Sequence, residues 1–541
     1  MKIGIFLAYG PQTHLGQEGL GRYLAGLVKG FSEQGQEVVI LTPKWSVENI
    51  TELFREFNIQ DDAVSFSVLE RVPVFWGVLK FAKKFRKKKE VKAKKYRILK
   101  TGVDLLEKLV GYMIHITNAV FFVALCMLLF LLGCILLPFA LVGTIVFLLA
   151  YLVKSLVKRQ QISPKELYRK LRLVTRKLSK TGVSIDEYAY NQFMDRTIVS
   201  LVDKANRQHV DLWFIPALFW PETKNLKQTR VITVPDLVTE EFANLCSDNT
   251  QYAYSTEKCR ETVRDGEFFI TYCEHIKKTV LEYEYGKQHV IAIPHPLNDM
   301  LTSIEIDKAI EKKLNSSKDF TDAFARIQMR TLPPHAKCLG DIYANYAFQN
   351  TKYIFYPSQA RPYKNLLNLV KAYHELVVKR YYNIKLILTC DFNMCPDVLE
   401  YITENGLQMD VFSFFGVSVQ QLASLYRCAE LVVTPTLYEG GFPFTFGEGM
   451  SVGTPSVMSD IPQVRDVVEQ YGLEKEMLFD PYDYHAIADK VAYGLQHRAE
   501  LYQKQLSLYK NMKKRTTAVV AKDYLCAFET FIKQAKEIEH V

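Results

Sequence analysis

The strongest constraint on the fold is a short apolar segment, Leu431–Thr434, which runs directly into a glycine-rich loop and then into a predicted helix. The loop carries one carboxylate, Glu439, and the helix carries a second, Glu448. In an open α/β sheet, ligands bind beyond the carboxyl ends of the strands, where a helix N-terminus attracts phosphate. Two carboxylates there would repel phosphate, so they are better suited to accept hydrogen bonds from hydroxyl groups. Because sugar and ribose supply hydroxyls and a diphosphate supplies the anion, the pattern predicts a nucleotide-sugar site.

The N-terminal segment predicts a sheet of the same kind. A strand over residues 2–9 is followed by a glycine loop, a helix from about Arg22 to Gln34 and a second strand over residues 37–42. This order of strand, loop, helix and strand is typical of a parallel, doubly wound sheet. Gly19 and Gly21 precede the predicted helix, where free backbone N–H groups can bind an anion. Further strands are predicted at 212–215, 230–234, 268–272, 290–293, 353–358, 385–389, 411–415 and 455–458.

Length, cysteine usage and charge narrow the class of protein. A chain of 541 residues is too long for one core and indicates two or three domains. The ten cysteines include no CxxC pair, which argues against a zinc site or a disulfide framework and favours a reducing compartment. The net charge of +9 is concentrated in Lys80–Lys100, which holds twelve Lys or Arg and one Glu. The rest of the chain is therefore close to neutral.

A long uncharged segment, Leu109–Val153, contains 45 residues without Asp, Glu, Lys or Arg. A membrane-spanning helix needs about 20 apolar residues, so the segment has room for two. Gly133 and Pro138 divide it into predicted helices at about 110–132 and 139–156. We expect a transmembrane or re-entrant helical hairpin, and a buried soluble hairpin is the less favoured alternative.

Basic residues flank both ends of this hairpin: Lys80–Lys100 precede it, and Lys154, Lys158 and Arg159 follow it. Basic flanks favour the cytoplasmic side, so both ends are expected at the cytoplasmic face of the cell inner membrane. Residues 80–159 would then contact anionic lipids. Nucleic-acid binding is not expected, because the basic block adjoins the apolar segment and lacks interleaved stacking aromatics.

A second candidate anion site follows the strand predicted at 353–358. Arg361 and Lys364 lie three residues apart in the next loop, and both can face one anion. Guanidinium forms fork-shaped hydrogen bonds and ammonium acts as a point charge, which suits phosphate. Downstream, Ser418 and Gln421 have the spacing of a capping box, which predicts a helix to about Cys428.

Taken together, the segment Tyr438–Met450 and the Arg361/Lys364 pair resemble the retaining GT-B glycosyltransferases of the "glycosyl transferases group 1" family (family 4). The resemblance implies that Glu439 contacts the transferred sugar and that Glu448 holds the ribose of the donor nucleotide. It also implies that the residues directly after Glu439 lie beside the donor. Eight residues separate the two glutamates where the family usually has seven, and a flexible extra glycine could absorb the difference. These donor-loop residues are Gly440, Gly441, Phe442 and Pro443.

The resemblance assigns further roles. Arg361 and Lys364 would grip the leaving diphosphate, Gly416 would lie near the base, and the loop with Gly19 and Gly21 would meet diphosphate or acceptor. Family members often have His-Asp after the strand that ends near residue 234, whereas this chain has Pro235 and Asp236. Asp236 is expected to bind sugar or acceptor hydroxyls; a helix-capping or turn role is the alternative.

The predicted architecture is α/β of the GT-B type, with two Rossmann-like doubly wound domains facing across a cleft plus the inserted hairpin. The predicted activity is a membrane-associated retaining hexosyltransferase that moves a sugar from a nucleoside diphosphate to a lipid-linked glycan or glycolipid. No cofactor and no metal are expected. The alternatives are a catalytically inactive scaffold that binds nucleotide or sugar, and a sugar-nucleotide epimerase. The predicted bounds are 1–75 with 185–298 (N-terminal domain), 76–184 (insertion, apolar over 109–153), 299–515 (donor domain) and 516–541 (a helix returning to the N-terminal domain).

Overall fold

The computed structural model describes residues 1–11, 13–17, 19–60, 63–70, 121–129, 131, 185–242, 250–304, 318–332 and 346–539. The basic block and the predicted hairpin lie outside these ranges, except for residues 121–129 and 131, which are helical. Within the described ranges, no helix combines the length and the apolarity needed to cross a membrane.

The N-terminal domain is built on a seven-stranded parallel sheet with the order β3-β2-β1-β4-β5-β6-β7. The central strand β1 pairs with β2 on one side and with β4 on the other. Because β4 follows the insertion in sequence, the chain before and after the insertion belongs to one sheet. The strands are β1 (Lys2–Phe6), β2 (Glu37–Pro43), β3 (Val64–Leu69), β4 (Leu212–Ile215), β5 (Arg230–Val234), β6 (Phe268–Thr271) and β7 (His289–Ala292).

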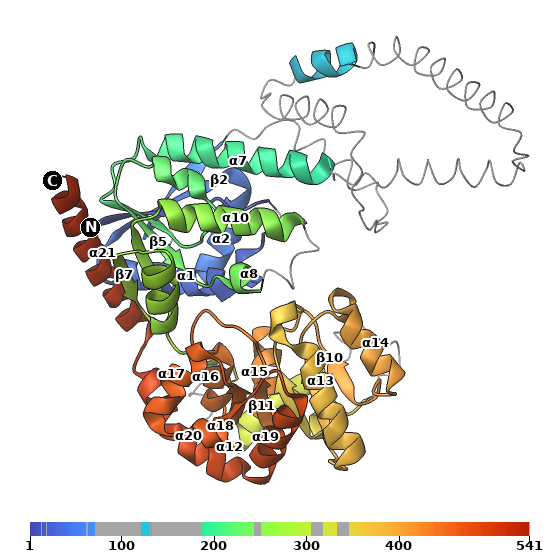
Figure 1. The fold of residues 1–541 in the computed structure, drawn as a ribbon. Coiled ribbons are helices and arrows are strands. Elements are labelled where there is room, and N and C mark those ends of the chain that lie inside the picture. Colours follow the sequence, from blue (N-terminus) through green and yellow to red (C-terminus); the bar gives the residue numbers. More distant parts are fainter. Residues whose placement is uncertain are drawn as a thin grey trace, which may run out of the picture.

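Helices cover both faces of this sheet (Figure 1). The first helix begins at Gly19, so Gly19 and Gly21 lie in its first turn and not in a loop before it. The prediction of a helix start at Arg22 was therefore wrong by one turn. Gly21 is required by packing, since a Cβ there would lie 2.0 Å from the carbonyl oxygen of Leu15. The helices are α1 (Gly19–Glu33), α2 (Lys44–Glu56), α7 (Ile185–Ala205), α8 (Val238–Glu241), α10 (Thr250–Asp265) and a π-helix (Ile276–Glu284).

The C-terminal domain repeats the plan with a six-stranded parallel sheet of order β10-β9-β8-β11-β12-β13. The strands are β8 (Tyr353–Tyr356), β9 (Lys385–Leu388), β10 (Val411–Ser413), β11 (Leu431–Thr434), β12 (Ser456–Ser459) and β13 (Leu478–Phe479). The helices are α12 (Lys318–Met329), α13 (Leu366–His374), α14 (Pro396–Glu404), α15 (Val419–Cys428), α16 (Phe444–Ser451), α17 (Pro462–Val468), α18 (Glu474–Met477), α19 (Tyr484–Gln496) and α20 (Arg498–Lys513).

The predicted capping box is present at the start of α15. Ser418 Oγ accepts a hydrogen bond from the backbone N–H of Gln421, and the Gln421 side chain accepts one from the backbone N–H of Ser418. Two N–H groups that the first helical turn would otherwise leave unpaired are thereby satisfied. The helix runs to Cys428, as predicted.

The last helix, α21 (Thr517–Glu539), returns to the N-terminal domain and packs against α1, with the two chain ends near each other (Figure 1). Close approach of the two helices depends on glycine, because a Cβ at Gly30 would lie 2.4 Å from the Cβ of Ala521. Tyr524 and Phe528 of α21 are fully buried, and both rings contact Phe214 of β4. The C-terminal helix therefore completes the core of the N-terminal domain.

Candidate functional site

Predicted site residues from three strands of two sheets come together where the domains meet. Asp236 follows β5 of the N-terminal sheet, Arg361 and Lys364 follow β8, and Glu439 follows β11. β8 and β11 are parallel neighbours, so the loops that carry Arg361, Lys364 and Glu439 leave the same edge of the C-terminal sheet. Asp236 is electrostatically coupled to Arg361, Lys364 and Glu439, which unites two cations and two carboxylates.

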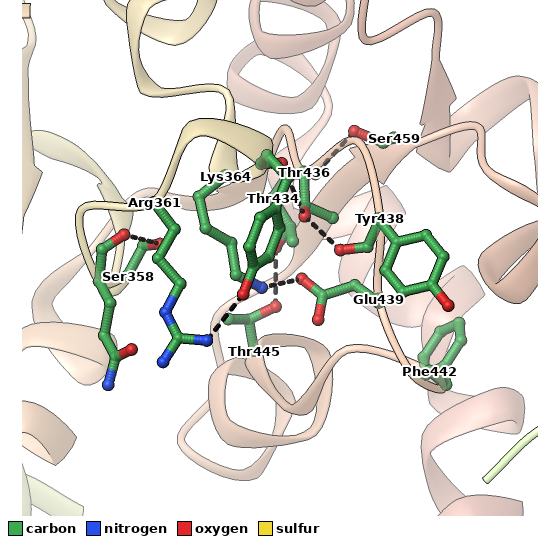
Figure 2. Close-up of polar contacts among 12 residues, drawn as sticks. Ser358, Arg361, Lys364, Thr434, Thr436, Tyr438, Glu439, Phe442, Thr445 and Ser459 are labelled. Carbon is green, nitrogen blue, oxygen red and sulfur yellow. Dashed lines mark hydrogen bonds and ion pairs between the residues drawn. The ribbon is translucent and has the colours of Figure 1, made fainter. Parts of the chain in front are cut away.

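Lys364 forms the central ion pair of this cluster. Its Nζ lies 2.5 Å from Oε1 of Glu439, and each side chain is only 19% exposed. Figure 2 shows the two side chains pointing toward each other. Burial lowers the pKa of Lys364, but Glu439 outweighs that effect and raises it above its ordinary value. Lys364 is therefore cationic at neutral pH. Lys364, which is predicted to bind the diphosphate, is therefore in direct contact with Glu439, which is predicted to bind the sugar.

The backbone around Lys364 is held by Asn365. Asn365 has a left-handed conformation with φ of 59°, which Asn tolerates better than most residues. Its side-chain amide donates to the carbonyl oxygens of Pro435 at 2.9 Å and Pro481 at 2.7 Å. These bonds tie the loop after β8 to the segments that follow β11 and β13, so the ion pair sits on a fixed scaffold.

Arg361 lies beside Lys364 in the same loop. Its guanidinium donates to the hydroxyl of Tyr363 at 2.8 Å. Burial raises the pKa of Tyr363 to about 12, with Arg361 acting in the opposite direction. Tyr363 is thus a neutral hydroxyl that orients the guanidinium, and Arg361 and Lys364 present two positive charges at one place.

Asp236 lies against the glutamate loop of the other domain. A Cβ built at Gly440 would be 1.8 Å from the carbonyl oxygen of Pro235 and 3.4 Å from Cβ of Asp236. A Cβ at Gly441 would be 3.1 Å from Cβ of Tyr272. Neither glycine has a positive φ. The pair permits close approach of two backbones and does not supply an unusual bend.

Burial raises the pKa of the Asp236 carboxyl. The hydrogen bond from Val238 N–H and the nearby Arg361 and Lys364 act to lower it. The Val238 contact, 3.4 Å from Oδ1, means that Asp236 also takes part in the turn that begins α8. Asp236 can therefore form this turn and also bind a hydroxyl group with its other carboxyl oxygen.

Glu448 lies in the second turn of α16 and is 9% exposed. Tyr426 donates to its Oε2 at 2.5 Å, and the Asn298 amide donates to its Oε1 at 2.9 Å. Burial raises the pKa of Glu448, and these two hydrogen bonds and Arg22 act to lower it. The influence of Arg22 places the start of α1 across from α16.

The remaining predicted residues have mixed surroundings. Phe442 is buried and packs on Phe446 with ring centroids 5.4 Å apart, and Pro443 is the buried N-cap of α16. Both shape the loop from within. Gly416 follows the edge strand β10 with φ of 76° and lies exposed, away from the charged cluster.

Sequence reasoning treated His295 as a linker residue, and the structure shows it buried at the domain boundary. Its Nε2 lies 2.8 Å from the carbonyl oxygen of Phe442, and its ring stacks on Phe444 at 3.8 Å. Burial lowers the pKa of His295, while the carbonyl oxygens of Pro296, 3.2 Å from Nδ1, and of Phe442 act to raise it. His295 therefore fastens the glutamate loop to the end of the N-terminal domain.

A shallow hollow of about 410 Å³ lies elsewhere, beside α18 and α19. Two of its charged side chains are already engaged: Asp489 pairs with Arg380, and Lys490 donates to the carbonyl oxygen of Lys475. The charged cluster between the domains is the better candidate, because its groups converge from separate strands.

The C-terminal domain also resembles known proteins. Residues 343–516 match the family model described as "Glycosyl transferases group 1". This range contains Arg361, Lys364, Glu439 and Glu448. The match covers the C-terminal domain.

Two curated relatives are mannosyltransferases. The O-antigen chain mannosyltransferase B of Escherichia coli is 32% identical over 163 residues, which cover 30% of this chain and 41% of that protein. The MMP alpha-(1->4)-mannosyltransferase of Mycolicibacterium hassiacum is 34% identical over 107 residues, 20% of this chain and 25% of that protein. The chain thus spans less than half the length of these relatives.

Solved structures resemble the chain over nearly its whole length. Anabaena Alr3699/HepE in complex with UDP has a TM-score of 0.51 at 10% identity, with 98% of this chain and 99% of that chain covered. The structure described as "Trehalose-6-phosphate from E. coli bound with UDP-2-fluoro glucose" has a TM-score of 0.51 at 10% identity and the same coverage. At these identities the likeness concerns the fold, which is α/β of the GT-B type with parallel sheets.

Proposed function

We propose that the chain is a retaining glycosyltransferase that moves a hexose from a nucleoside diphosphate to an acceptor hydroxyl. The observation that carries this proposal is the convergence of Arg361, Lys364, Glu439 and Asp236 at the domain boundary. Two cations suit a diphosphate, and two carboxylates suit sugar hydroxyls. Mannose is the first hexose to test, since both curated relatives are named mannosyltransferases.

The diphosphate would bind between Arg361 and Lys364. In the transfer step the bond from the anomeric carbon to the β-phosphate oxygen breaks, and a bond from that carbon to the acceptor oxygen forms. Negative charge develops on the departing phosphate, where fixed cations stabilise the transition state most. The acceptor proton passes to the leaving phosphate. Lys364 would shift part of its interaction from Glu439 to phosphate, which frees Glu439 to accept a sugar hydroxyl.

Retention follows from attack on the face from which the phosphate leaves, and the paired-glutamate pattern supports it by resemblance. Asp236 would bind a hydroxyl of the sugar or of the acceptor from the N-terminal side. In the remaining roles, Glu448 would hold the ribose, Gly416 would lie near the base, and the backbone around Gly19 and Gly21 would face the phosphate or acceptor side. The donor is a substrate, and the proposal needs no further cofactor or metal.

We also propose that the insertion binds the cytoplasmic face of the inner membrane and that the acceptor is a lipid-linked glycan or glycolipid. Five large apolar side chains in the described part of the insertion are 52–65% exposed: Phe121, Val123, Met127, Leu128 and Leu131. Adjacent basic residues would each add roughly 1 kcal/mol of attraction to anionic lipid. Flotation with phosphatidylglycerol and phosphatidylcholine vesicles tests this, and no flotation with either would refute it.

The deciding experiment for the transfer reaction uses the full chain in detergent. Thermal shift with UDP, GDP, ADP, CMP and dTDP should reveal one preferred nucleotide, and both Lys364→Ala and Glu448→Ala should weaken its effect. The matching nucleotide-hexose is then followed for turnover, and the anomeric configuration of the product is read by NMR. Binding without hydrolysis or transfer would favour the inactive scaffold, and no binding would refute the donor site.

A further inference from the structure

Glu448 is held by two parts of the chain that sequence reasoning did not connect with it. Tyr426, on α15, lies 22 positions before Glu448, and its hydroxyl donates to Oε2 at 2.5 Å. Asn298 lies 150 positions before Glu448, in the segment between the two sheets, and its amide donates to Oε1 at 2.9 Å. Each carboxylate oxygen therefore already accepts one hydrogen bond from the protein.

Tyr426 is itself fixed in place. It is fully buried, and its ring meets that of Phe355 edge-on with centroids 5.0 Å apart. Its carbonyl oxygen accepts a hydrogen bond from the Thr454 hydroxyl at 2.7 Å. A side chain held in this way offers its hydroxyl in one direction, so it fixes the orientation of the Glu448 carboxylate.

Asn298 is fixed by contacts between its neighbours and α16. The backbone N–H of Met300 donates to Oγ of Ser451 at 3.0 Å. One turn earlier, a Cβ at Gly447 would lie 2.6 Å from Cγ of Leu297. The linker therefore runs along α16 in close contact, and Asn298 cannot shift without disturbing both of these contacts.

The geometry leaves each oxygen of Glu448 with one remaining lone pair. Two acceptor positions on one carboxylate suit a pair of neighbouring hydroxyls. We propose that Tyr426 and Asn298 are positioning residues that orient the Glu448 carboxylate toward the ribose diol of the donor nucleotide. The inference rests on the proposed function and names two residues on which donor recognition depends.

The charge on Glu448 depends on the same contacts. The groups that act on its pKa besides burial are Tyr426, Asn298 and Arg22 of α1, and all three lower it. Loss of either hydrogen bond moves the pKa of Glu448 further upward. Nucleotide binding needs the ionised carboxylate and is lost as the pH falls and the carboxylate is protonated. In the variants this loss should occur at a higher pH than in the parent protein.

The test compares nucleoside diphosphates with their 2′-deoxy counterparts on the full chain, for Tyr426→Phe and Asn298→Ala. We expect each variant to bind the ribonucleotide roughly tenfold more weakly, the size of one lost hydrogen bond to a charged group. The preference for ribose over 2′-deoxyribose should shrink by a similar factor, and the pH midpoint of binding should rise. Tyr353→Phe is the matched control, since its buried hydroxyl donates to the carbonyl oxygen of Leu425.

A failure of the positioning role and a failure of the donor site give different results. If the parent protein binds nucleotide but both variants keep the ribose preference and the pH midpoint of the parent, the positioning role is refuted while the donor site stands. If the parent binds no nucleotide, both fall. The Asn298→Ala variant decides the matter if Tyr426→Phe unfolds, because it changes an exposed residue of the linker.

Discussion

The hydroxyl of Tyr438, in the C-terminal domain, accepts the backbone N–H of Leu237 in the N-terminal domain at 3.1 Å. Both residues are 2% exposed. Val238 and Tyr363 pack against the same ring to form a small apolar cluster between the domains. Tyr438 directly precedes Glu439, so this contact joins the domains one residue away from the central ion pair.

Replacement of Tyr438 by Phe should weaken that junction. The substitution leaves the buried Leu237 N–H without its partner, which costs about 1–3 kcal/mol. We expect a lower unfolding free energy in urea and a larger radius of gyration in X-ray scattering. Tyr482→Phe serves as the control, because Tyr482 is 68% exposed. Equal stability of the two variants would show that the hydrogen bond is not an interdomain tie.

Lys364→Ala should abolish most donor turnover. The change removes a fixed cation from the position proposed for the diphosphate and leaves Glu439 without its ion-pair partner. A loss of about 10²–10³ in kcat is expected for one electrostatic donor at a transition state. Lys352→Ala is the matched control, since Lys352 is exposed at the opposite end of β8. Unchanged turnover in Lys364→Ala would remove Lys364 from the mechanism.

Local sequence patterns predicted the strands that are short apolar runs ending in turn residues, but they did not predict β3 or β13. They placed β4 and β5 at the observed residues and the capping box at Ser418. The partners of Glu448 were beyond their reach, since the Asn298 contact depends on how the linker runs along α16. The need for glycine at position 440 could not be predicted from local sequence either, because the backbone that Gly440 approaches belongs to the other domain.

Gly440→Ala should separate the glutamate loop from the N-terminal domain. The added Cβ would lie 1.8 Å from the Pro235 carbonyl oxygen, and neither backbone can yield as a flexible side chain would. We expect a loss of about 1–3 kcal/mol in stability, typical of overpacking, together with weaker donor binding. Gly16→Ala is the control, since its nearest neighbour would be 4.0 Å away. A Gly440→Ala protein that matches this control in melting and binding would disprove the close contact.

Asp236→Asn should separate stability from activity. Because burial raises the folded-state pKa of Asp236 above 3.8, ionisation opposes folding, and this carboxyl stabilises the fold only at low pH. Its contribution is complete below about pH 3.8 and is lost as the pH rises through the folded pKa. At pH 7 the Asn variant should therefore have a larger free energy of unfolding than the parent, by about 1.4 kcal/mol per unit of pKa shift. At pH 3.5 the two proteins should be equally stable. Turnover should fall, because Asn cannot accept hydrogen bonds at both side-chain atoms. A variant less stable than the parent at pH 7 would mean that Asp236 is held ionised by Arg361 and Lys364.

Phe528→Ala tests whether α21 completes the core of the N-terminal domain. Phe528 is fully buried and contacts Phe31 of α1 and Phe214 of β4 with ring centroids 5.8 and 5.5 Å apart. Loss of a core phenylalanine costs about 3–5 kcal/mol through lost burial and the cavity that remains. Since α21 follows the C-terminal domain in sequence, the destabilisation should nevertheless appear in the N-terminal domain. Hydrogen exchange should quicken in β1 and β4, while β8 and β11 keep the protection of the parent. Lys533→Ala, an exposed change on the same helix, should leave all four strands unaffected. Faster exchange confined to the C-terminal sheet would show that α21 does not support the N-terminal core.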